Sequence, residues 1–157
     1  MLYLIRHHHY CYAAYALLLI GAVGCDRDEP LPDEIHKVQI EMTGHDFKWH
    51  SRYAGKDNTI GTDDDLHAAQ VLHVPLNAEV EIFLKSRDYL YSLEVPQARR
   101  KEIAVPDLTF SLTFTADKLG TFKMPGDQMC GYTHPDLMGT LIVETPADYV
   151  RWLNAQR

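Results

Sequence analysis

The segment from Gly126 to Gly139 carries the residues with the most chemistry in this chain. Within it, Cys130, His134 and Met138 follow one another at intervals of four residues. Thiolate, imidazole and thioether are ligands with which proteins hold copper, and a compact loop that carries all three changes little when the metal changes oxidation state. Taken singly, each residue has an ordinary structural explanation as a small buried thiol, a loop cap or a core filler. Together they predict a metal site.

The positions of the three cysteines restrict the possible roles of the Cys130 thiol. Of the three cysteines, Cys11 lies in an apolar N-terminal stretch and Cys25 follows that stretch directly. Only Cys130 lies in the part of the chain with strand patterning. A single thiol cannot form an internal disulfide, so in an exported protein it is shielded, reactive or bound to a metal.

Residues 1–24 have the layout of an export signal, because Arg6 and three histidines precede an uncharged stretch rich in Leu and Ala. The stretch ends in Ala22-Val23-Gly24 before Cys25, an ending that resembles the lipobox of bacterial lipoproteins. Two alternatives stay open: lipidation of Cys25 after cleavage, or an uncleaved anchor shorter than the roughly 20 apolar residues of a comfortable membrane span. In both cases we expect the domain to lie on the periplasmic, extracytoplasmic face, tethered to the membrane.

Residues 25–36 form an acidic, proline-containing stretch that is typical of an extended tether. Residues 37–157 form the predicted domain. Apolar and polar residues alternate over Val38 to Met42, Val80 to Leu84 and Thr109 to Phe114, with turn signals between these runs. Alternation with a period of two indicates half-buried strands, and many short strands favour an all-β antiparallel sandwich or barrel.

The end of the chain and the composition complete this description. Thr145 as a cap and Pro146 at the first helical position predict a short C-terminal helix.

With 46% apolar and 24% charged residues, the chain fits one globular domain with its own core. Its net charge of −7 argues against a nucleic-acid partner and suits a basic partner such as a small cytochrome. Clustered aspartates between Asp57 and Asp65 do not match a calcium-loop spacing and indicate a solvated acidic turn.

Six segments that precede the Gly126–Gly139 segment give a second indication of fold and function. In chain order they are Gly44 to Trp49 with Tyr53, Tyr53 to Asp65, Leu72 to Pro75, Ser86 to Pro96, Ala104 to Pro106 and Gly120 to Phe122. In this order they resemble the periplasmic copper A domain of cytochrome c oxidase subunit II, over nearly everything from Val38 to Leu153. The resemblance implies a cupredoxin-like antiparallel Greek-key β-sandwich, a copper cofactor and single-electron transfer.

The resemblance also implies a damaged ligand set. The family's centre uses two cysteines, two histidines, a methionine and a backbone carbonyl. In this chain the second cysteine and the second histidine are kept as Cys130 and His134, and the carbonyl position falls at Gln128. The replaced positions are Tyr91 for the first histidine, Gly126 for the first cysteine and Leu137 for the methionine, with Met138 one residue further on.

A two-copper centre needs two bridging thiolates, which this domain cannot supply by itself. We therefore expect a remodelled, mononuclear copper site, with Cys130 and His134 as strong ligands and Met138 as a weak one. Tyr91 would project from the place of the lost histidine, and its hard oxygen would favour Cu(II). In the aromatic segment, Phe47 stands where the family receives electrons and Trp49 matches the second aromatic residue. Trp49 is assigned to the cofactor site, with core packing as the alternative.

The predicted function is that of an exported electron-transfer protein, a subunit or relative of a haem-copper oxidase, which is not a catalyst alone. Its partner would be subunit I of such an oxidase or a small cytochrome. One alternative is a copper-free structural subunit, as in the quinol-oxidising relatives of the family. The other is a periplasmic Cu(I) carrier that hands over its ion through Cys130 and the nearby methionines Met124, Met129 and Met138.

Overall fold

The structure, a computed structural model, describes residues 34–129 and 134–156 of the chain. The predicted signal, the start of the tether and Cys130 lie outside these ranges. Within them the chain forms a series of short strands, two 3₁₀ turns (Pro96–Ala98 and Pro135–Leu137) and one α-helix. The elements are β1 (Lys37–His45), β2 (Lys48–Tyr53), β3 (Leu66–Ala69), β4 (Val71–Pro75), β5 (Glu79–Ser86), β6 (Tyr91–Val95), β7 (Arg100–Ala104), β8 (Phe110–Thr115), β9 (Gly120–Met124), β10 (Gly126–Gln128), β11 (Gly139–Glu144) and α1 (Pro146–Ala155).

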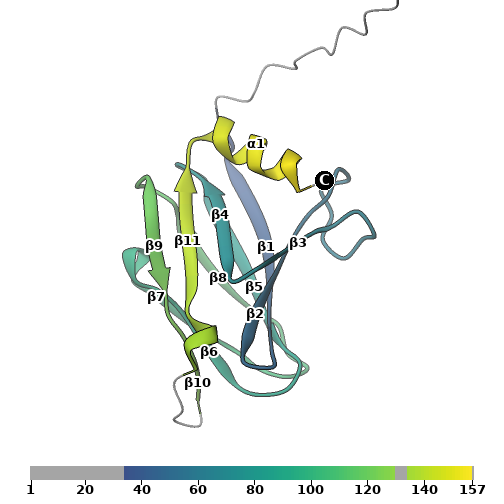
Figure 1. The fold of residues 1–157 in the computed structure, drawn as a ribbon, viewed down its shortest axis with the longest axis vertical. Coiled ribbons are helices and arrows are strands. Elements are labelled where there is room, and N and C mark those ends of the chain that lie inside the picture. The colour runs from purple at the N-terminus through teal and green to yellow at the C-terminus, as the bar shows by residue number, and fades with distance from the viewer. Residues whose placement is uncertain (1–33, 130–133, 157) are drawn as a thin grey trace, which may run out of the picture.

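The strands form a sandwich whose two ends differ. One sheet has the order β3-β2-β1-β5-β8, and two three-stranded sheets have the orders β10-β6-β7 and β4-β11-β9. In Figure 1, α1 lies across the upper end of the sandwich, and β10 with the 3₁₀ turn before β11 lies at the opposite end. The predicted all-β sandwich with a short C-terminal helix is confirmed.

The core follows from the alternation that the sequence displays. On β1 the side chains of Val38, Ile40 and Met42 are buried, and the residues between them face outward. β5 repeats the pattern with Val80, Ile82 and Leu84. Successive side chains of a strand point to opposite faces, so each strand presents one apolar row to the core. Burying a side chain of this size contributes roughly 1.5–3 kcal/mol.

The strand pairing is mixed where the sequence predicted only antiparallel neighbours. β1 pairs with β5 in parallel, with Ile40 opposite Ile82, and β11 pairs with β4 in parallel. The other neighbouring strands within each sheet are antiparallel. A parallel pair needs a long crossover, and residues 46–78 provide one between β1 and β5. Local alternation carries no information on this choice.

Helix α1 is capped and docked as its sequence predicts. The Thr145 hydroxyl accepts a hydrogen bond from the Asp148 backbone N–H at 3.2 Å, and Pro146 occupies the first turn. The Trp152 ring then stacks on His73 of β4, with the ring centroids 4.2 Å apart. In the part of the chain that the structure describes, no helix is long and apolar enough to cross a membrane.

Candidate functional site

The predicted metal loop joins β10 to β11, and only part of it is described. Cys130 lies outside the described residues. His134 directly precedes the 3₁₀ turn Pro135–Leu137 and is half-buried, whereas Met138 directly follows the turn and is 43% exposed. The imidazole therefore lies at the rim of the sandwich and the thioether faces solvent. The metal role of these three residues stays a prediction.

Leu137, at the family's methionine position, ties this loop to the large sheet. Its side chain is fully buried, and its backbone carbonyl accepts a hydrogen bond from the Trp49 indole N–H at 3.1 Å. Trp49 is itself fully buried on β2, and its ring meets that of Tyr91 edge to face, with 5.7 Å between centroids. Such a contact adds to the stabilisation from burial. In the described residues Trp49 packs in the core, and its predicted cofactor role is untested.

Gly126 marks the place of the family's first cysteine, and that place is filled. A Cβ atom at Gly126 would lie 2.4 Å from the Leu137 carbonyl oxygen and 2.4 Å from Trp49 Nε1. Both atoms belong to the hydrogen bond that holds the loop. A side chain cannot be added at Gly126 unless backbone or indole moves, because close-packed interiors lack the space.

Tyr91, at the family's first histidine position, is fully buried on β6. Its hydroxyl donates to Asp88 Oδ1 at 2.8 Å and accepts the Phe47 backbone N–H at 3.3 Å. Gly44 makes room for its ring, since a Cβ there would lie 2.4 Å from it. Burial and the hydrogen bond to Asp88 raise the pKa of Tyr91 far above its ordinary value. Tyr91 is thus a neutral phenol, and binding a metal as phenolate would require it to give up these contacts.

An aromatic stack fixes the orientation of His134. Phe47 lies at the β1–β2 turn, where Asp46 and Phe47 adopt φ values of 53° and 59°, as a two-residue type I′ hairpin requires. The Phe47 ring lies 4.0 Å from the His134 ring and 5.1 Å from the Tyr89 ring, nearly parallel to both. The His134 ring makes no hydrogen bond to any described residue. Among the described residues, the ring is therefore held by stacking alone and no nitrogen is engaged.

Asp88 organises the backbone beneath this stack. Its carboxylate accepts the backbone N–H of Asp46 and of Tyr89 and the Tyr91 hydroxyl, each at 2.8 Å. Burial by itself would raise the pKa of Asp88, but these hydrogen bonds outweigh it and the pKa lies below its usual value. His45, Asp46 and Asp88 offer ligand atoms within 4.8 Å of one another. Because three donors already occupy the Asp88 oxygens, the cluster is explained by its role in the turn.

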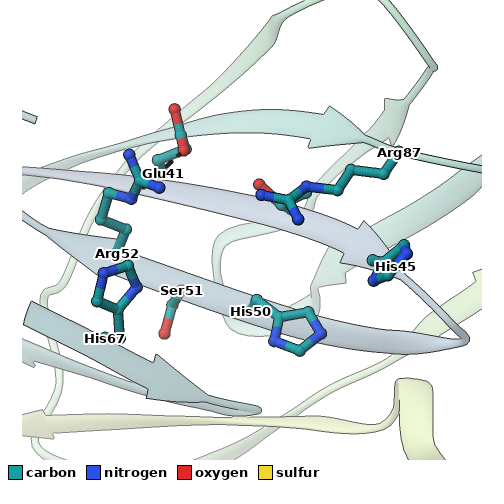
Figure 2. A pocket seen from close by; sticks show the side chains of 8 residues that line it. Glu41, His45, His50, Ser51, Arg52, His67 and Arg87 are labelled. Atoms are coloured by element: carbon teal, nitrogen blue, oxygen red, sulfur yellow. Dashed lines mark ion pairs between the residues drawn. The ribbon is translucent and has the colours of Figure 1, made fainter. Parts of the chain in front are cut away.

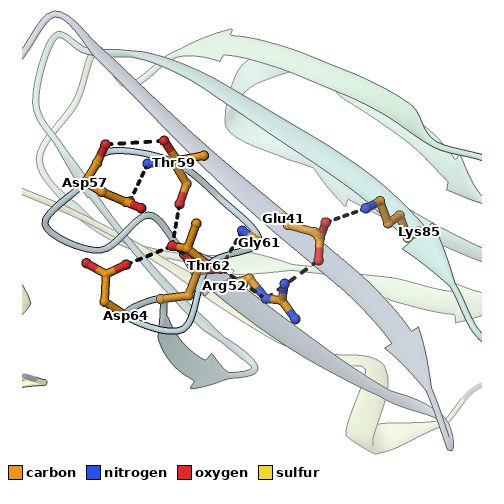
Figure 3. Close-up of polar contacts among 9 residues, drawn as sticks. Glu41, Arg52, Asp57, Thr59, Gly61, Thr62, Asp64 and Lys85 are labelled. Atoms are coloured by element: carbon orange, nitrogen blue, oxygen red, sulfur yellow. Dashed lines mark hydrogen bonds and ion pairs between the residues drawn. The ribbon is translucent and has the colours of Figure 1, made fainter.

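The aspartates after β2 accept hydrogen bonds from backbone N–H groups and a threonine hydroxyl within their own loop (Figure 3). Asp64 Oδ2 accepts the Lys56 backbone N–H at 2.6 Å and Asp64 Oδ1 accepts the Thr62 hydroxyl at 2.8 Å. Asp65 accepts the Gly61 N–H at 2.6 Å and lies 3.6 Å from Arg52 Nε. The Thr62 and Lys56 bonds lower the pKa of Asp64. These contacts agree with the predicted acidic turn.

The donor set at this end of the sandwich does not fit a two-copper centre. The three replaced positions offer a buried phenol, a glycine and a buried leucine, none of which supplies a soft sulfur or an imidazole. The residue types that suit one copper ion are those of His134, Met138 and, from the sequence, Cys130. Sequence reasoning missed the Asp88–Tyr91 bond and the Phe47–His134 stack. The available signal was Gly44, whose lack of a side chain admits the Tyr91 ring.

No family model matches the chain, but individual proteins do. It is 28% identical to the alternative cytochrome c oxidase subunit 2 of Bradyrhizobium diazoefficiens, over 76% of this chain and 51% of that protein. It is 30% identical to the cytochrome c oxidase subunit 2 of Alkalihalophilus pseudofirmus, over 74% of this chain and 32% of that protein. The chain thus spans about half the length of the first relative and about a third of the second.

Among solved structures, the periplasmic domain of subunit II of the Bradyrhizobium japonicum cytochrome oxidase matches with a TM-score of 0.66. The match has 16% sequence identity and covers 80% of this chain and 96% of that one. Similarity at this level establishes the fold, which is cupredoxin-like. Together with the sequence relatives, it confirms the predicted resemblance: this chain carries a subunit II-like cupredoxin domain.

Proposed function

We propose that this subunit II-like cupredoxin domain works outside the cytoplasm as an electron-transfer subunit of a haem-copper oxidase-type complex, with a single copper ion in the loop between β10 and β11. Cys130 and His134 would hold the ion and Met138 would be a weaker ligand. Bound copper would supply one-electron redox chemistry. The observation that carries the proposal is the His134 ring, which is fixed by Phe47 and hydrogen-bonded to none of the described residues.

The surrounding residues have defined roles in this proposal. Phe47 keeps the imidazole plane fixed, so that little reorganisation accompanies a change of charge at the loop. The Trp49 N–H holds the Leu137 carbonyl and with it the end of the loop next to Met138. Neutral Tyr91 adds no negative charge to the core beneath His134. The acidic surface of the chain, with a net charge of −7, would attract a basic electron donor such as a small cytochrome.

A copper-free structural subunit is the second candidate, and a different observation favours it. The three replaced ligand positions are not vacant: Gly126 lies against Trp49, Leu137 fills the core and Tyr91 is hydrogen-bonded to Asp88. Such a packed end could brace a large subunit without metal.

A Cu(I) carrier is the third candidate. It is supported by the exposure of Met129 at 58% and Met138 at 43%, whereas Met124 is fully buried and could not contact a passing ion.

The experiment is metal analysis with absorption spectroscopy on the purified full chain after copper addition. We expect one copper ion per chain and an intense thiolate-to-copper band. Cys130→Ser and His134→Phe should abolish both, and His36→Gln, at an exposed site, should leave both unchanged. No copper in the wild-type chain would support the structural subunit, one colourless Cu(I) would support the carrier, and two copper ions would contradict all three.

The membrane tether is proposed from the relatives' subunit II assignment and from Cys25. Lipidated Cys25 or an uncleaved N-terminal segment would hold the domain beside subunit I of the oxidase. Mass spectrometry of the membrane fraction, with Cys25→Ser as the variant, separates these alternatives. A lipid-sized mass increase lost in the variant supports lipidation, and unchanged membrane retention of the variant supports the uncleaved anchor. A wild-type chain found free in the soluble extracytoplasmic fraction would contradict the tether.

A further inference from the structure

A polar pocket of about 170 Å³ lies on the outer face of the five-stranded sheet, and none of the residues that line it belongs to the segment from Gly126 to Gly139. Its lining includes the cationic or potentially cationic side chains of His45, His50, Arg52, His67 and Arg87, together with Glu41 (Figure 2). A water molecule occupies about 30 Å³ in the liquid, so the pocket has room for a small ligand with a few waters. Three of the six histidines within the described ranges line it.

The pocket arises from strand alternation and register. Outward-facing residues of β2 are Lys48, His50 and Arg52, because Trp49, Ser51 and Tyr53 face the other way. Register sets Arg52 opposite Glu41 of β1 on one side and opposite His67 of β3 on the other. In Figure 2 the Arg87 side chain extends over β1 from the segment that follows β5. Four separate segments thus point basic groups into one hollow.

The charge balance of the pocket leaves donors unused. The one carboxylate in the lining, Glu41, is shared by two cations, since one of its oxygens lies 2.5 Å from Lys85 Nζ and the other 3.8 Å from Arg52 Nε. The Arg87 guanidinium has no hydrogen bond or ion pair with any described residue. The rings of His50 and His67 have no hydrogen bonds there either. Arg52 also lies 3.6 Å from Asp65, so the donors that bind no described residue are those of Arg87, His50 and His67.

We propose that this pocket binds a small tetrahedral oxyanion, of the sulfate or phosphate class. The planar guanidinium of Arg87 can donate two parallel hydrogen bonds to such an anion, and charge-assisted bonds of this kind are the strong ones. The imidazoles of His50 and His45 lie on the same sheet face, with ring centroids 6.3 Å apart, and supply further N–H donors. This inference is independent of copper and of the electron-transfer role.

The test is calorimetric titration of the full, metal-free chain at neutral pH with sodium sulfate and, separately, with inorganic phosphate. We expect saturable binding of one anion per chain. Arg87→Gln should weaken it about tenfold or more, the loss expected for a charge-assisted hydrogen bond, and His50→Gln should weaken it by a smaller factor. Arg100→Gln, an exposed arginine on β7 in another sheet, is the matched control and should bind like the wild type.

Two outcomes would overturn the proposal: absence of saturable binding of either anion by the folded wild-type chain, or equal affinity in the wild type and Arg87→Gln. Circular dichroism checks that each variant is folded. A preference for one anion identifies the ligand class within the proposal. Because the titration uses metal-free protein and residues remote from Cys130 in sequence, its failure would leave the copper proposal untouched, and failure to bind copper would leave this result untouched.

Discussion

Two histidines at opposite ends of the sandwich stack on aromatic rings, but they differ in the hydrogen bonds that their ring nitrogens make. At the α1 end, His73 lies 4.2 Å from Trp152 with the rings 8° from parallel, and its Nδ1 lies 2.8 Å from Glu144 Oε1. At the loop end, His134 lies 4.0 Å from Phe47, and its ring has no hydrogen bond to the described residues. Stacking fixes the orientation of both rings. The unused nitrogens distinguish the candidate ligand from the structural histidine.

The core beside the candidate loop is closely packed. At the loop end, Trp49, Tyr91 and Leu137 are fully buried, and the Trp49 indole with the Leu137 carbonyl leaves no room for the family's first thiol at Gly126. The two stacking rings, Phe47 and Trp152, are both partly buried against the core. Substitutions in the loop-end core should therefore affect stability most, and substitutions of the two stacked histidines should separate stability from metal binding.

The largest effect is expected from Gly126→Cys, which restores the family's residue. The new Cβ would meet the Leu137 carbonyl and the Trp49 indole at 2.4 Å, so we expect a loss of about 3 kcal/mol in the free energy of unfolding. Urea denaturation measures it, with Thr113→Cys, exposed on β8, as the control for an added thiol. Equal stability of the two variants, or a second bound copper in Gly126→Cys, would show that the loop end is open after all.

Tyr91→Phe should have the next largest effect. It removes the hydroxyl donor to Asp88 and the acceptor for the Phe47 N–H, and we expect a loss of about 1–2 kcal/mol at neutral pH. Tyr89→Phe is the matched control, because Tyr89 is 46% exposed and its hydroxyl bonds to no described residue. A loss in the control as large as in Tyr91→Phe would contradict the role of the buried bond.

The Tyr91→Phe deficit should depend on pH in a defined direction. The pKa of Asp88 is lowered in the folded chain, so the stability that it contributes is fully present above the unfolded aspartate pKa of about 3.9. That contribution is lost as pH falls from there through the lowered folded value. Urea midpoints at pH 7 and at pH 3 should therefore show a smaller difference between wild type and Tyr91→Phe in acid. A difference that grows in acid would contradict the Asp88 linkage.

The smallest stability effects, and the sharpest contrast, are expected from His73→Phe and His134→Phe. Both keep an aromatic ring for stacking. His73→Phe loses the bond to Glu144 and should cost about 1 kcal/mol with copper binding unchanged. His134→Phe should leave the free energy of unfolding nearly unchanged and abolish copper binding. If the two variants exchange these behaviours, His134 is not a copper ligand and the proposed contrast between the two histidines is wrong.

The sequence predicted the parts of the fold that depend on local periodicity and capping. The runs at Val38–Met42 and Val80–Leu84 lie within β1 and β5, and Thr145 and Pro146 begin α1 as expected. Parallel pairing of β1 with β5 could not be predicted, because a strand shows the same alternation of apolar and polar residues whether its neighbour runs parallel or antiparallel. For the candidate site, the sequence showed which of the family's ligand residues this chain has and which it lacks. It did not show which residues surround His134.

By itself, the sequence determined that this domain has strands of period two, one terminal helix and a single thiol in the segment from Gly126 to Gly139. These features depend only on neighbouring residues or on which residues are present. Only the tertiary structure decided that the Trp49 N–H meets the Leu137 carbonyl 88 positions away, and that the Tyr91 hydroxyl meets the Phe47 N–H across 44 positions. Such contacts depend on how the sheets pack in three dimensions. That packing buries Tyr91, Gly126 and Leu137 and leaves His134 half-buried at the rim.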